Sequence, residues 1–78
     1  MFKTTYTKEE ADELLRWMDT QPKGEMDLGD GIFIKDIAFF INQMRSIVQN
    51  RHNNPAFAGQ IEILSRLKQA YEEKEKHE

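Results

Sequence analysis

The chain has 78 residues and a formal net charge of -3, with 32% charged and 38% hydrophobic residues. This length fits one domain, because compact domains usually need at least about 50 residues each. The lack of cysteine excludes disulfides, thiolate catalysis and cysteine-ligated zinc. The longest strictly apolar run, at residues 37–41, is far shorter than the roughly 20 residues of a membrane-spanning helix, and no apolar signal core is present. We therefore expect one small domain located in the cytoplasm.

The first predicted helix covers about residues 8–20. Thr7 and Glu10 have the spacing of a capping box, in which each side chain accepts a hydrogen bond from the other residue's backbone N–H. Apolar residues then recur at helical spacing, namely Ala11, Leu14, Leu15, Trp17 and Met18. Together these features predict a helix that begins directly after Thr7.

Residues 21–31 form an unusually long connection. They hold three of the four glycines and one of the two prolines, and helix-to-helix connections usually have only about 2–8 residues. Met26 and Leu28 alternate with acidic residues, which predicts a short extended piece that lies against the helices. We predict no strand pair here.

Two further helices complete the predicted fold. The second covers about residues 33–50, with a wide apolar stripe that leaves Phe39 among polar residues. The third covers about residues 55–74, because Asn54 is a good N-cap and Pro55 suits the first helical position. With flexible ends at 1–5 and 75–78, the whole chain, 1–78, is predicted to be a single all-α domain, a compact three-helix bundle with a long first connection.

The residues that commonly carry catalysis are poorly placed for it. Ser46 and Ser65 fall on polar helix faces instead of a strand–turn–helix elbow, and His52 lies in a predicted loop. A calcium-loop alignment that uses Gly31 as the turn glycine puts apolar residues at ligand positions. The polar helix faces are acidic or mixed, which disfavours membrane-surface binding. We therefore expect no enzymatic activity, cofactor, metal, membrane contact or small-molecule ligand.

Several apolar residues exceed what the helix stripes require. They are Phe39, Met26 and Leu28, together with Phe2 and Tyr6 near the N-terminus. One interpretation is that single exposed hydrophobic residues are ordinary. The other is a surface for a protein partner, with a self-complementary dimer as the commonest form. The sequence thus predicts a non-enzymatic interaction module, a homodimer or a binder of an unidentified protein, with the candidate interface residues Phe39, Met26 and Leu28 on the second helix and the 21–31 connection.

An alternative function is nucleic-acid binding by a small regulator. The cations Arg45, Arg51, His52, Arg66 and Lys68 could form a basic cluster on the second and third helices, whose short connection is similar to a helix-turn-helix outline. A recognition helix normally carries several cations that face phosphates. The third helix has no charge in its first seven residues, so the alternative is the less favoured of the two.

Three segments of the sequence are familiar in combination. They are YTKEE…LLRW in residues 6–17, FIKDI in residues 33–37, and NNPAF…GQI in residues 53–61. This combination resembles a family of small bacterial proteins, each about the size of this chain, that is classed as a domain of unknown function. The resemblance covers most of the chain, from about Tyr6 to Tyr71. It implies an all-helical domain and brings no catalytic residue, because its motifs consist of helix caps and core residues.

Overall fold

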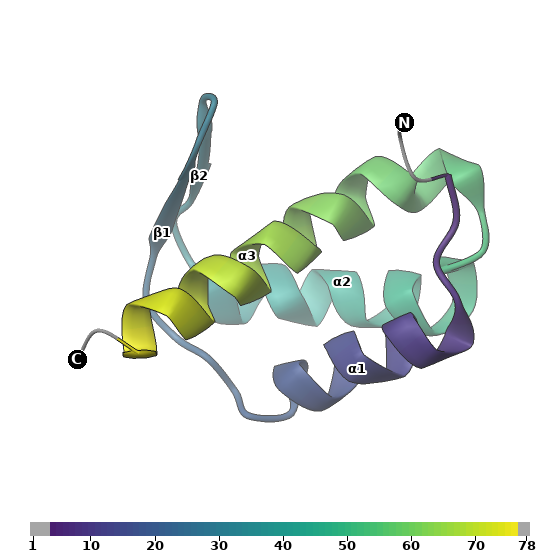
Figure 1. Ribbon diagram of the computed structural model, residues 1–78, viewed down its shortest axis with the longest axis horizontal. Coiled ribbons are helices and arrows are strands. Elements are labelled where there is room, and N and C mark those ends of the chain that lie inside the picture. The colour runs from purple at the N-terminus through teal and green to yellow at the C-terminus, as the bar shows by residue number, and fades with distance from the viewer. Residues whose placement is uncertain (1–3, 77–78) are drawn as a thin grey trace.

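The computed structural model describes residues 4–76, which form three α-helices and a small antiparallel sheet. In chain order the elements are α1 (Lys8–Met18), β1 (Met26–Gly29), β2 (Ile32–Ile34), α2 (Ile37–Arg51), the 3-10 turn η1 (Pro55–Phe57) and α3 (Ala58–Lys76). Figure 1 shows α3 lying across the pair formed by α1 and α2, while the hairpin of β1 and β2 projects from the end of the bundle where α2 begins.

The predicted all-α fold class is wrong, because residues 26–34 form a β-hairpin and the fold mixes helices with a sheet. Its turn residues, Asp30 and Gly31, have φ angles of 55° and 78°. Positive φ at both central residues is what a tight type I′ hairpin turn needs, and Asp-Gly is a favoured pair for it. The extended piece expected at Met26 and Leu28 is confirmed as β1, but a partner strand accompanies it.

The second helix begins four residues later than predicted. Asp36 is the N-cap of α2, and its Oδ1 accepts a hydrogen bond of 3.1 Å from the backbone N–H of Phe39. The N–H of Ile37 donates to the carbonyl oxygen of Gly24 at 2.9 Å. These two bonds satisfy first-turn donors that have no partner within the helix. They fix the start of α2 at Ile37, so that residues 33 and 34 belong to β2.

The starts of the other two helices were predicted from local signals. Thr7 and Glu10 form the expected capping box of α1, with both reciprocal hydrogen bonds present. Asn54 accepts from the N–H of Ala56 at 2.9 Å and precedes Pro55, as expected, although the first turn after it is 3-10 before α3 continues. Of the ends predicted to be flexible, residues 1–3 and 77–78 lie outside the described part, as does Phe2. Residues 75 and 76 are helical.

The core lies between the three helices. Its fully buried large side chains come from all of them and are Met18, Ile37, Val48, Ile61, Leu64 and Leu67. Trp17 of α1 meets Tyr71 of α3 edge to face, with ring centroids 6.0 Å apart, a favoured geometry for aromatic pairs. Apolar packing therefore joins all three helices, and the Trp17–Tyr71 pair adds an aromatic contact between α1 and α3.

Two hydrogen bonds join the segment before α1 to the residue after α2. The N–H of Tyr6 donates to the carbonyl oxygen of His52 at 2.8 Å. In return, Nδ1 of His52 donates to the carbonyl oxygen of Tyr6 at 2.9 Å, because a carbonyl can only accept. The side chain of Tyr6 is thereby held in the core, with 8% of its surface exposed, so it does not join a surplus apolar surface.

The hairpin is attached to α3 through a bulge in β1. The register pairs Asp27 with Phe33 and Gly29 with Ile32, which leaves Leu28 without a partner in the ladder. Nη2 of Arg66 donates to the carbonyl oxygen of Leu28 at 3.1 Å. The same nitrogen lies 3.4 Å from Oδ2 of Asp30. Arg66 thus connects the middle of α3 to both the bulge and the turn of the hairpin.

Candidate functional site

The three predicted interface residues lie in different environments. Phe39 is exposed, with 60% of its surface accessible. Met26 and Leu28 are half-buried and pack against the core. Met26 and Leu28 are two residues apart in β1, and residues two apart in a strand face the same side of the sheet. The side of β1 that carries them is turned toward the helices, so only Phe39 of the three presents a large apolar surface to solvent.

A second exposed aromatic residue, Phe33, lies close to Phe39. Phe33 has 54% of its surface accessible, and these two are the large hydrophobic residues that are exposed among residues 4–76. Both line one shallow hollow, together with Ile34, Lys35, Asp36, Phe40 and Gln43. We refer to these seven residues as the Phe33/Phe39 surface.

Local structure explains why this surface is apolar and exposed. In β2, alternation turns Ile34 inward to the core and Phe33 outward. The Asp36 cap then starts α2 so that Phe39 sits in its first turn, where its backbone N–H is bonded to the cap. The chain therefore brings one aromatic residue from a strand and one from a helix together across a short connection.

Charges of both signs border the two phenylalanines. Lys35 and Asp36 are consecutive, exposed residues between β2 and α2. One oxygen of Asp36 accepts the Phe39 N–H. The surface thus joins an apolar centre to a positive and a negative group, a composition that suits contact with another protein.

Three cations of the predicted basic cluster have partners within the chain. Arg45 on α2 pairs with Asp19, the C-cap of α1, at 3.0 Å. Arg66 on α3 contacts the hairpin. Lys68 pairs with Glu13 at 3.6 Å and with Glu72 at 3.1 Å. These intramolecular partners reduce the positive charge that Arg45, Arg66 and Lys68 could offer to phosphates, while Arg51 is exposed at the end of α2.

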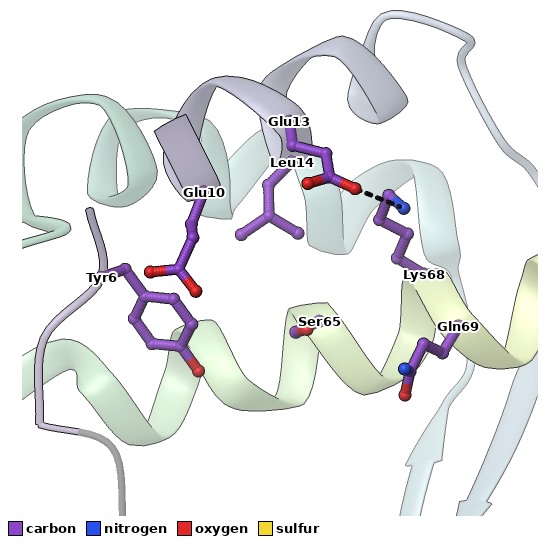
Figure 2. Close-up of a pocket in the computed structure, with 7 residues that line it drawn as sticks. All are labelled: Tyr6, Glu10, Glu13, Leu14, Ser65, Lys68 and Gln69. Carbon is purple, nitrogen blue, oxygen red and sulfur yellow. Dashed lines mark ion pairs between the residues drawn. The ribbon is translucent and has the colours of Figure 1, made fainter. Parts of the chain in front are cut away.

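A second hollow, shown in Figure 2, lies between the N-terminal segment, α1 and α3. Its volume is about 160 Å³, and it is lined by Tyr6, Glu10, Glu13, Leu14, Ser65, Lys68 and Gln69. The ion pair of Glu13 with Lys68 crosses it, and Oε1 of Glu10 accepts from the N–H of Thr7 at 2.9 Å. Its charged groups therefore act in contacts within the chain, joining α1 to α3 and capping α1.

Two other kinds of feature can be stated for residues 4–76. No helix there is long and apolar enough to cross a membrane. In the same residues, no three histidine, aspartate or glutamate side chains come close enough together to hold a metal ion.

Comparison with known families shows the family to which the chain belongs. The family described as "Domain of unknown function (DUF6965)" matches residues 9–73. The chain belongs to this family. The expected resemblance to a family of unknown function is confirmed, and no curated protein or solved structure matches the chain. Because the DUF6965 match runs from the first turn of α1 into the last turns of α3, it includes both the hairpin and the Phe33/Phe39 surface.

The sequence prediction missed Phe33, because it placed this residue at the start of the second helix. A signal that could have found it is the Asp30-Gly31 pair. That pair between short apolar runs is typical of a hairpin, and alternation along the following strand then places Ile32 and Ile34 on one side and Phe33 on the other.

Proposed function

We propose that this protein is a non-enzymatic interaction module that self-associates through the Phe33/Phe39 surface. The observation that carries the proposal is the placement of the two large exposed hydrophobic residues, Phe33 and Phe39, in one hollow. Apolar residues exposed singly are ordinary, whereas apolar residues that gather in one place are typical of interaction sites. Of the apolar residues that the sequence left unexplained, Phe39 lies on this surface, where Phe33 accompanies it.

A second copy of the chain is the partner that we propose. Small soluble oligomers are most often symmetric dimers, in which the same patch of each copy meets the other. In such a dimer both copies bury this surface, so four phenylalanine rings are buried. The free energy gained by burying each phenylalanine therefore contributes twice. Lys35 and Asp36 at its border are exposed. A two-fold arrangement can place the positive group of each copy next to the negative group of the other.

We also propose that the module acts in the cytoplasm. The chain contains no cysteine, so its stability does not depend on a disulfide or on an oxidising compartment. The small core of such a chain rarely supplies more than about 3–5 kcal/mol, and a partner subunit would add to it.

Light scattering coupled to size-exclusion chromatography tests the proposal. At loading concentrations from micromolar to millimolar, the mass should rise from near 9.2 kDa toward twice that value. Phe39→Glu should hold the mass at the monomer value at loadings where the wild type is dimeric, because it puts a charge into the apolar centre. A monomer mass for the wild type at every concentration overturns the proposal.

Phe39→Glu should not impair folding, so a loss of dimer in this variant can be attributed to the changed surface. Position 39 is the third residue of α2 after its Asp36 cap, and a glutamate there suits the helix dipole and a capping box. Gln49→Glu is the matched control, because it adds the same charge to an exposed position of α2 about 15 Å further along the helix. We expect the control to dimerise as the wild type does. A Phe39→Glu variant that also dimerises normally would exclude this surface.

A further inference from the structure

We infer that the two copies join by strand addition, with β2 of one copy pairing antiparallel to β2 of the other, centred on Phe33. The two hairpins then form one four-stranded sheet. This inference rests on the proposed self-association and specifies its geometry, because it assigns a backbone edge and a register where the proposed function assigns only a surface.

The two edges of the hairpin differ in how well they are covered. The bulge of β1 is held by Arg66 of α3, which donates to the Leu28 carbonyl, and β1 is the strand that lies beside α3. Among the described residues, β2 is bonded to β1 in a sheet of two strands, so its other edge has no neighbouring strand. An uncovered edge is a ready template for a further strand. The available edge is therefore that of β2.

The exposed side chain of Phe33 favours a register centred on this residue. β2 has three residues, Ile32–Ile34, so a two-fold axis at the middle residue pairs the whole strand with its copy. Each Phe33 then lies directly opposite the other, on the outward face of the sheet. Aromatic residues placed opposite each other across antiparallel strands stabilise the pair. Phe39 borders the same hollow and would cover the flank of this aromatic pair.

Charge complementarity gives independent support for a second copy as the added strand. In the register centred on Phe33, Lys35 of one copy lies opposite Gly31 of the other, next to its Asp30. The Asp30 side chain is 84% exposed, and Lys35 is exposed as well. Two-fold symmetry creates this lysine–aspartate contact twice. The edge is thus complementary to itself in charge as well as in its apolar centre.

Charge reversal tests this register without removing a phenylalanine. Lys35→Glu puts two glutamate–aspartate contacts into the dimer, and Asp30→Lys puts two lysine–lysine contacts into it. We expect each variant alone to raise the dimer dissociation constant about tenfold in low salt, because attraction becomes repulsion at two exposed contacts. An equimolar mixture of the two variants should recover dimers of wild-type affinity, because both contacts in the mixed dimer then join opposite charges.

Two controls separate this effect from damage to the fold. Lys23→Glu makes the same charge change at an exposed position outside the Phe33/Phe39 surface and should leave the dissociation constant unchanged. The double variant Lys35→Glu/Asp30→Lys should dimerise by itself, which a variant that unfolds through loss of the Asp30–Arg66 contact would not do.

The outcomes also separate this inference from the proposed function. A wild-type dimer that Phe39→Glu dissociates, but that neither charge reversal weakens, overturns the strand pairing and leaves self-association in place. Weakening by both reversals without recovery in the mixture also overturns the register. A wild-type chain that is monomeric at every concentration overturns both the inference and the function on which it rests.

Discussion

The carbonyl oxygen of Leu28 accepts a 3.1 Å hydrogen bond from Nη2 of Arg66 at the position where the hairpin ladder skips a residue. A bulge leaves the polar groups of its extra residue without a partner in the sheet. The guanidinium of Arg66 supplies the missing hydrogen-bond donor for the Leu28 carbonyl. The irregularity in β1 is therefore the feature that joins the hairpin to the helices.

Arg66→Met should loosen the attachment of the hairpin to α3. The variant keeps most of the apolar stem but loses the donors, so we expect the free energy of unfolding to fall by about 1–2 kcal/mol. Amide hydrogen exchange in residues 26–34 should accelerate more than exchange in α1. Arg16→Met, which removes an exposed arginine of α1, is the control and should change neither quantity. Equal effects of the two variants would contradict the role of Arg66.

His52→Ala should loosen the segment before α1. It removes the donor that holds the Tyr6 carbonyl, at an expected cost of about 1 kcal/mol in urea unfolding. His52→Asn offers an amide N–H in place of Nδ1 and should recover most of the loss. If the asparagine variant is as unstable as the alanine variant, the ring of His52 stabilises the protein by packing and not by this bond.

Gln21→Gly should stabilise the protein. Gln21 has a φ of 56° just after α1, in the left-handed region that glycine adopts without strain at helix C-termini. We expect the free energy of unfolding to rise by about 0.5–1 kcal/mol. Lys23→Gly, two residues later and outside the positive-φ set, should lower it instead. Thermal unfolding followed by circular dichroism would rank the two variants against the wild type.

Asp36→Ala should shorten α2 at its start. The variant loses the cap on the Phe39 N–H, which typically costs about 1 kcal/mol. Asp36→Asn keeps an acceptor oxygen and should stay close to the wild type in stability. Loss of stability in both variants would mean that the charge, and not the cap, is what α2 requires.

Sequence reasoning succeeded where a structure is encoded by neighbouring residues. The capping box of Thr7 and Glu10 and the Asn54-Pro55 pair each act within one turn of chain, so their patterns can be recognised without knowing the fold. The starts of α1 and of the η1–α3 segment were predicted correctly for this reason.

The hairpin was missed because a short apolar run fits both a helix and a strand. Ile32, Phe33 and Ile34 extend the apolar stripe of α2 backwards, which favoured one long helix. The contact that decides the start of that helix joins the Ile37 N–H to Gly24, in a loop whose path cannot be read from periodicity. Tertiary structure therefore overrode the local pattern at this point.

The candidate site was predictable only in part. Phe39 was identified because it fell outside the helical stripe, whereas Phe33 was lost together with the strand that exposes it. The intramolecular partners of the predicted basic residues could not be recognised from the sequence either. Arg45 and Arg66 find partners in Asp19 and the hairpin, and such distant pairings leave no mark in the spacing of the sequence.

The position of α3 has a consequence for how the chain gains and loses its structure. This helix touches α1 through Tyr71, the hairpin through Arg66, and also packs against α2. Because α1, α2 and the hairpin all contact α3, none of them can unfold without exposing part of the surface of α3. Unfolding should thus be all-or-none, so that helix circular dichroism and the fluorescence of Trp17, the single tryptophan, follow one common transition.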